Sequence, residues 1–228
     1  MVSIELPELQ HVDAALETDT KKGVFGGGYR IEGRLSIGVP NSFVITTDLV
    51  ASDALLKGFL ESNGKEFVFY VTSLACTFQP GDDESFARAW LNLQLARTGQ
   101  LADKGQAIAW SMQPVRLEES FKTSTTVKLG VDLKFVEVSP EVITDGVQKE
   151  IMIQAFNEGQ SDPYWQFTKT PHSPLEGSYR LALVVRTLAG SKTHGSIRVK
   201  ADVLRRKFGL FTYKADFSGA PKMDFELP

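Results

Sequence analysis

The feature that most constrains the fold is a run of alternating residues from Thr125 to Val138, TTVKLGVDLKFVEV. Apolar side chains occupy every second position: Val127, Leu129, Val131, Leu133 and Phe135. Successive side chains of a β-strand point to opposite faces of a sheet, so this period predicts a strand with one buried and one wetted face. We expect one long strand here, paired with residues 147–156 across the loop SPEVITDG.

Further segments rich in β-formers are separated by turn signals along the whole chain. The predicted strands are 29–37, 42–49, 66–78, 86–97, 106–113, 164–169, 179–188, 197–203 and 211–217. Strands at this spacing, with scarcely a crossover helix, favour antiparallel sheets. The fold class expected is mainly β: an antiparallel β-sandwich, immunoglobulin-like or jelly-roll-like, with one or two short helices, forming one large or two smaller sandwiches.

A single helix is predicted over residues 52–63. Ser52 is placed to cap its first turn, and Asn63-Gly64 predicts a left-handed stop. The apolar residues recur at helical spacing: Leu55, Leu56, Phe59 and Leu60. Residues 66–78 and 86–97 are then expected to pair as a β-hairpin across the turn GDDE.

Three regions are predicted from these patterns. Residues 1–28 look weakly structured, residues 29–118 form a β-rich domain with the helix, and residues 119–228 form an immunoglobulin-like β-sandwich. The polar stretch RLEESFKTS, residues 116–124, is the boundary candidate, although no Pro/Gly/Ser-rich linker separates the halves.

Composition excludes several functional classes. The formal charge of −3 and pI near 5.7 argue against a general nucleic-acid-binding protein and against charge-driven adhesion to a membrane. The lone cysteine, Cys76, allows no internal disulfide, and its alternating neighbours predict a buried residue. The segment MVSIELPELQHVDAALETD lacks the features of a signal peptide, so we expect a cytoplasmic protein.

No motif announces catalysis or a cofactor. The three histidines, His11, His172 and His194, lie far apart, and neither a CxxC pair nor a GxSxG elbow is present. We therefore expect no metal, no cofactor and no catalytic residue.

Aromatic and basic residues supply the binding candidates. Trp90 lies among Arg88, Asn92 and Gln94, on the side of its predicted strand opposite a row of apolar residues. An outward tryptophan among polar neighbours suits an interface or a stacking platform, although a covering element is the alternative. Tyr164, beside a turn, is a second exposed candidate, and its neighbour Trp165 is expected in the core.

The basic triplet that begins at Arg205-Arg206 completes the candidates. It suits an acidic partner or a phosphate, and a solvated strand end is the alternative.

Three functions follow from these observations. The first is a non-catalytic interaction module or subunit of a larger assembly, binding another protein or a second copy of itself through an exposed sheet face. The second is a hydrolase whose loop carboxylates meet at one end of the sandwich: Asp82, Glu84, Glu158 and Asp162. The third is a carbohydrate-binding module that uses exposed aromatic residues.

Overall fold

The computed structural model describes residues 1–14, 32–98, 105–118, 125–136, 150–207, 211–216 and 222–228. The strands of these residues are β1 (Val2–Glu5), β2 (His11–Ala14), β3 (Arg34–Val44), β4 (Phe67–Gln79), β5 (Glu84–Arg97), β6 (Ile108–Gln113), β7 (Arg116–Glu118), β8 (Thr126–Leu129), β9 (Ile151–Phe156), β10 (Tyr164–Thr168), β11 (Gly177–Leu188), β12 (Thr193–Lys207), β13 (Phe211–Asp216) and β14 (Lys222–Glu226). The helices are α1 (Ala54–Asn63) and the short 3-10 helix η1 (Val131–Leu133). The chain is mainly β with antiparallel pairing, as predicted.

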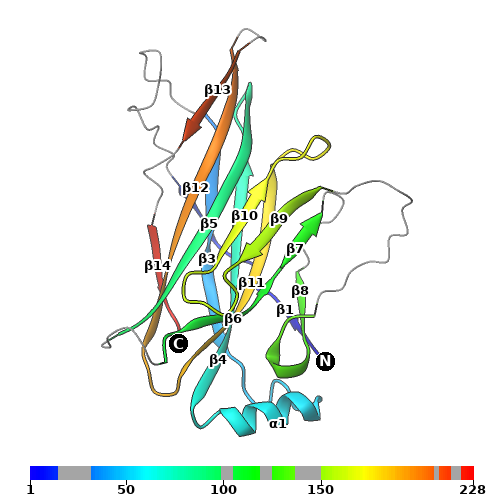
Figure 1. Cartoon of the computed structure of the whole chain (residues 1–228), viewed down its shortest axis with the longest axis vertical. Coiled ribbons are helices and arrows are strands. Elements are labelled where there is room, and N and C mark those ends of the chain that lie inside the picture. The colour runs from blue at the N-terminus through cyan, green and yellow to red at the C-terminus, as the bar shows by residue number, and fades with distance from the viewer. Residues whose placement is uncertain (15–31, 99–104, 119–124, 137–149, 208–210, 217–221) are drawn as a thin grey trace, which may run out of the picture.

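The strands form two large sheets and one small one (Figure 1). The seven-stranded sheet has the order β13-β12-β5-β10-β9-β7, with β14 also paired to β12. The five-stranded sheet has the order β2-β3-β4-β11-β6, and β1 pairs with β8. The predicted hairpin between residues 66–78 and 86–97 is wrong, because β4 and β5 belong to different sheets. β4 lies between β3 and β11, and β5 lies between β10 and β12.

One large hydrophobic core lies between the two sheets. The five-stranded sheet contributes Leu74 and Phe78 from β4, and the seven-stranded sheet contributes Leu91 and Phe167. Rings meet across the layer: the Phe78 centroid lies 5.2 Å from that of Phe167 and 5.3 Å from that of Phe86. Edge-on aromatic contacts of this kind stabilise a core beyond the area that they bury.

A second core lies on the other side of the five-stranded sheet. Phe69, Val71 and Val184 point away from the first core and pack against apolar side chains of β1, β8, α1 and η1. This third layer explains why most positions of β4 and β11 are buried, since both of their faces are covered. Together the layers are sheet, sheet, and a cover of one helix with a short two-stranded sheet.

Helix α1 has its expected place but different ends. Asp53 is the N-cap, and its carboxylate accepts hydrogen bonds from the amides of Leu55 and Leu56. Gly64 ends the helix with φ −66°, so the predicted left-handed stop is wrong. Buried Leu56 and Leu60 attach the helix to the second core.

The alternating run at Thr125 is not one long strand. Its first residues form β8, which pairs with β1 and not with residues 147–156. The chain then turns: the Gly130 amide donates to the Lys134 carbonyl, and Leu129 bridges Phe135. Apolar residues keep their period across the turn, but Val131 is 64% exposed. We call residues 126–136 the β8 hairpin.

The sheets combine the regions that the sequence suggested as separate. β5 lies between β10 and β12, and β11 lies between β4 and β6, so strands before and after residue 118 alternate in both sheets. The prediction of weak structure is wrong for residues 2–5 and 11–14, which form strands. Residues 15–28 of the same predicted region lie outside the described residues.

Candidate functional site

The outward-facing side chains of β5, β10, β9 and β12 form the surface that contains the predicted binding residues. Strand register places them in rows: Gln154, Gln166, Trp90 and Lys200 in one row, and Phe156, Tyr164, Asn92 and Arg198 in the next. We call these eight residues, together with Arg88, the platform. Its strands are buried on their other side, where Leu91, Trp165 and Val199 face the core.

Complete burial in the monomer would exclude Trp90 from binding, but this residue is only half-buried. Its indole N–H donates to Gln166 Oε1 over 3.3 Å, and the Arg88 guanidinium lies 5.9 Å from the ring centroid. Arg88 Nε also approaches Asp202 Oδ2 at 3.6 Å. Side chains on adjacent strands therefore orient the indole, and no further layer of described residues packs over it in this sheet.

Tyr164 is stacked on Phe156, with ring centroids 4.7 Å apart and an interplanar angle of 11°. The two residues are directly opposite each other on β9 and β10. Tyr164 is also opposite Asn92, two positions from Trp90 on β5, so the two aromatic groups occupy neighbouring rows. Phe156 was not among the binding residues predicted from the sequence. Its position at the end of a predicted strand, just before a turn, was the signal that could have indicated it.

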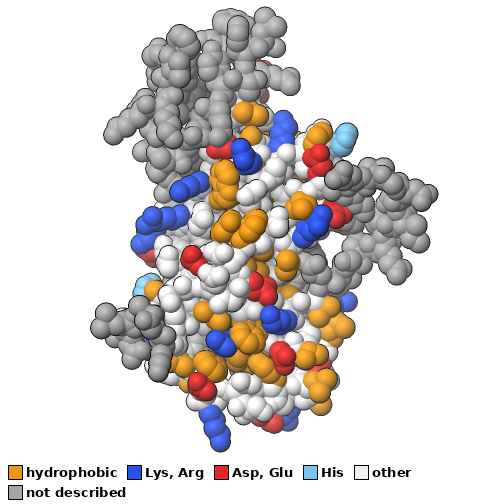
Figure 2. All heavy atoms as spheres, viewed as in Figure 1, with side chains coloured by type: hydrophobic (Ala, Val, Ile, Leu, Met, Phe, Trp, Pro, Cys, Tyr) orange, Lys and Arg blue, Asp and Glu red, His pale blue; other side chains and the backbone are white. Residues whose placement is uncertain are grey.

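Arg198 and Lys200 supply the positive charge of the platform. Lys200 is opposite Trp90, Arg198 is opposite Asn92, and both side chains are exposed. Among the described residues neither cation has an ion pair, and Arg198 is opposite another cation, Lys222 of β14. Figure 2 looks onto this side of the molecule and shows apolar groups set among basic, acidic and uncharged polar side chains.

The predicted residues Arg205 and Arg206 do not lie beside Trp90. They belong to the far part of β12, where Arg205 is opposite Glu84, five positions from Lys200. At about 3.3 Å per residue the backbone separation is about 16 Å. Their side chains lie outside the described part of the structure, so their role stays a prediction.

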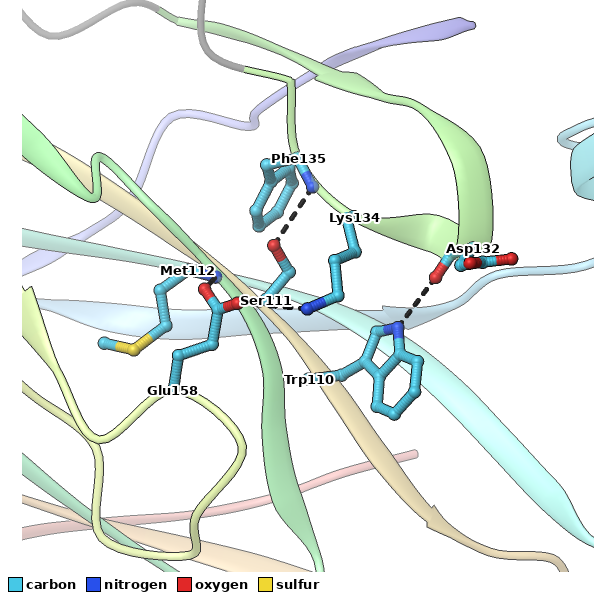
Figure 3. A network of polar contacts seen from close by, with 7 residues as sticks. All are labelled: Trp110, Ser111, Met112, Asp132, Lys134, Phe135 and Glu158. Atoms are coloured by element: carbon cyan, nitrogen blue, oxygen red, sulfur yellow. Dashed lines mark hydrogen bonds and ion pairs between the residues drawn. The ribbon is translucent and has the colours of Figure 1, made fainter.

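A second polar cluster joins the β8 hairpin to β6 (Figure 3). The Trp110 indole N–H donates to the Asp132 carbonyl over 2.7 Å, and the Phe135 amide donates to Ser111 Oγ over 3.0 Å. Glu158 completes the cluster: one oxygen accepts from the Met112 amide at 3.1 Å and the other from Lys134 Nζ at 3.2 Å. These bonds hold the hairpin along β6, the edge strand of the five-stranded sheet. Without the hairpin, this side of the edge strand would be more exposed.

Side chains surround the Trp110 ring on several sides. The Arg186 guanidinium lies 4.7 Å from its centroid and Lys134 Nζ lies 5.6 Å away. The rings of Phe59 and Phe69 lie at 6.4 and 6.0 Å. Burial lowers the pKa of Arg186 from its ordinary value. Because the chain itself fills these positions, Trp110 serves the packing of the cover.

The four carboxylates of the hydrolase hypothesis do not meet. Glu84 begins β5 and accepts from the Gly33 amide at 2.7 Å, with Asp82 in the preceding turn. Asp162 and Glu158 belong to the loop whose Ser161 carbonyl accepts from Leu95, near the other end of β5. Eleven residues of strand separate the two pairs by about 35 Å.

Other sites for chemistry are equally unsupported in the described residues. No three of their His, Cys, Asp and Glu side chains gather as a metal site. Cys76 is fully buried, as predicted, and burial raises the pKa of its thiol above the ordinary range. In the same part of the chain, no helix combines the length and apolar character needed to cross a membrane.

Comparisons with known proteins give no family. No family model matches the chain, and no curated protein matches its sequence. Among solved structures, the delta-toxin of Clostridium perfringens aligns with 7% identity over 96% of this chain and 86% of the toxin, at a TM-score of 0.32. The NetB toxin of Clostridium perfringens, in its membrane inserted form, aligns with 8% identity over 95% of both chains, at a TM-score of 0.31. These values establish neither a shared fold nor a shared activity.

Proposed function

We propose that the chain is a non-catalytic binding module that holds another macromolecule on the platform. The observation that supports this most directly is the strand register, which gathers Arg88, Trp90 and Tyr164 on one sheet face over which no other layer of the described residues packs. Tryptophan, tyrosine and arginine are the residue types that contribute most to binding energy at interfaces. The proposal includes a protein partner, self-association and a carbohydrate, and it places the protein in the cytoplasm.

The packing of two antiparallel sheets around one core supports a β-sandwich as the finer description of the fold. Whether this sandwich is immunoglobulin-like or jelly-roll-like stays a prediction. In either type a sheet with one buried and one free face is a rigid support, and rigid strands position binding side chains more accurately than loops.

The test compares ligand retention by the wild type and two platform variants, Trp90→Ala and Tyr164→Ala. We expect an array of immobilised proteins and polysaccharides to contain a ligand that the wild type retains and that both variants lose by about tenfold or more. Sedimentation velocity on the same proteins measures self-association.

The matched control is Lys57→Gln, which removes an exposed cation from α1, far from the platform. It should retain the same ligand as the wild type. Equal retention by the wild type and both platform variants would contradict the proposal, because the platform would then make no contribution.

A further inference from the structure

We propose that the ligand of the platform is an acidic polysaccharide, a polymer of uronic acids whose carboxylates meet Arg198 and Lys200 while its sugar rings lie against Trp90 and Tyr164. This inference rests on the proposed function, since it names the chemistry of the ligand for the same surface. It is carried by three features of the platform: unpaired cations, oriented aromatic rings and side-chain amides.

The charge of the platform is opposite to that of the whole chain. The chain has a formal charge of −3, yet Arg198 and Lys200 stand exposed without an ion pair among the described residues. Lys222 lies opposite Arg198, but it is paired with Asp224, whose Oδ1 lies 3.0 Å from its Nζ. The nearby carboxylate of Asp202 is buried and lies beside Arg88. Among the described residues, Arg198 and Lys200 are thus left without a countercharge, and an anionic ligand would supply one.

The aromatic residues are held by side chains of adjacent strands. Gln166 fixes the Trp90 indole from β10, and Phe156 supports Tyr164 from β9. Side chains diagonal to one another across a strand pair are about 7–8 Å apart, which separates two neighbouring binding positions along a ligand. A pyranose ring presents C–H groups on its faces, and such a face packs against an aromatic ring.

Amides provide partners for hydroxyl groups. Asn92, Gln154 and Gln166 lie between and beside the aromatic residues in the two rows. A carboxamide carries both a donor and an acceptor, so it can bind a hydroxyl group in either sense. A sugar polymer needs this mixture along its edge, whereas a simple polyanion needs only cations.

Protein and nucleic acid fit the platform less well. The large apolar side chains that are exposed among the described residues lie elsewhere: Met1, Val12, Val39, Val44, Leu49, Leu55, Val115 and Val131. None of them belongs to β5, β9, β10 or β12, so beyond the half-buried rings of Trp90, Tyr164 and Phe156 the platform offers cations and amides, not further apolar area. Two unpaired cations on a chain of negative net charge also give little of the counterion release that drives nucleic-acid binding.

The experiment measures binding of four polymers to the whole chain by isothermal titration calorimetry. The probes are polygalacturonate, dextran (sugar rings without charge), poly-L-glutamate (carboxylates without sugar rings) and poly(dT). We expect polygalacturonate to bind about tenfold more tightly than each of the others. The double variant Arg198→Gln/Lys200→Gln and the variants Trp90→Ala and Tyr164→Ala should each lose about tenfold, while Lys57→Gln binds like the wild type.

Circular dichroism establishes that each variant is folded, and the exposed Arg198→Gln/Lys200→Gln pair keeps the test valid if a tryptophan variant does not fold. Suppose that poly-L-glutamate, dextran or poly(dT) binds as tightly as polygalacturonate or more tightly, and that Trp90→Ala loses this binding. The acidic-polysaccharide ligand would then be overturned, and the platform would stand as a binding surface. Polygalacturonate binding that is unchanged in every platform variant would overturn both. If none of the four probes binds, the inference is wrong, and the array decides the proposed function separately.

Discussion

The outer faces of the two large sheets each present a partly buried tryptophan near an arginine, but they differ in what covers them. Over the five-stranded sheet, α1, β1 and the β8 hairpin pack on Trp110, and its indole N–H reaches a backbone carbonyl at 2.7 Å. Over the seven-stranded sheet, Trp90 has a longer 3.3 Å bond to a side chain. The difference shows that one tryptophan completes an internal layer, while the other still offers contact area to a partner.

The largest expected effect tests this difference directly. Trp110→Ala removes the ring that contacts Phe59, Phe69 and the β8 hairpin, so it should lower the free energy of unfolding by about 3 kcal/mol. Trp90→Ala should lower it by less than about 1 kcal/mol, because the described contacts of its ring are the side chains of Gln166 and Arg88 and not packed aromatic rings. Urea denaturation measures both. Equal losses in the two variants would remove the distinction between the covered and the uncovered face.

A change of pH tests the stability of the hydrophobic core between the two large sheets, which contains Cys76 and Tyr179. Burial raises the pKa of the Cys76 thiol above its ordinary range and that of the Tyr179 hydroxyl to about 12. The folded chain therefore keeps protons that the unfolded chain releases, and stability that is complete at neutral pH is lost as the pH rises past the ordinary thiol pKa. By pH 10 the free energy of unfolding should fall by about 2 kcal/mol.

This alkaline loss should be the same in Trp90→Ala as in the wild type, since Cys76 lies between the sheets. Cys76→Ala is the control, and its stability should change less between pH 7 and pH 10. A loss of the same size in Cys76→Ala would show that another group causes it.

A smaller effect concerns the attachment of the cover. Glu158→Gln weakens the bonds to Lys134 and to the Met112 amide, and should lower the free energy of unfolding by about 1 kcal/mol. Hydrogen exchange of the Phe135 amide should become faster, because its partner Ser111 lies in the same cluster. Asp162→Asn, in the same loop but without a side-chain bond to the hairpin, is the matched control. An unchanged exchange rate of the Phe135 amide in Glu158→Gln would show that Glu158 does not help to hold the hairpin on β6.

Alternation and continuous apolar runs predicted the long strands β4, β5, β11 and β12, but not the structure of residues 125–136. The period-two pattern around Trp90 predicted which side chains of β5 face the core, and the structure buries Leu91, Leu93 and Leu95 as expected. Strand pairing was not predictable in the same way. The expected hairpin of β4 with β5 relied on sequence proximity, whereas the burial of both faces of β4 requires partners on β3 and β11.

The β8 hairpin shows why a pattern can be right and its interpretation wrong. Its alternation continues through a tight turn in which Asp132 and Leu133 have φ of 56° and 58°. Aspartate adopts this left-handed region more often than most residues, but leucine rarely does, so the residue types favour the turn at Asp132 and not at Leu133. Leu133 is buried in the second core, so tertiary packing selects the turn.

The platform was predictable only in part. Arg88, Trp90 and Tyr164 were singled out from their local patterns, and they share one face because β5 and β10 pair in a register that no local pattern reveals. The same register adds Phe156 and separates the platform from Arg205. Whether the platform binds a ligand stays a prediction.

The alternation of early and late strands in both sheets has a consequence for how the chain acquires its structure. β5 lacks both neighbours until β10 and β12 have been synthesised, and β4 lacks one until β11 has. Contacts between residues far apart in sequence must form before either sheet closes, which is the topology of a slowly folding protein. Until residues up to β12 have been synthesised, the apolar strands of the nascent chain have incomplete sheets, a state in which exposed strand edges and apolar surface favour aggregation.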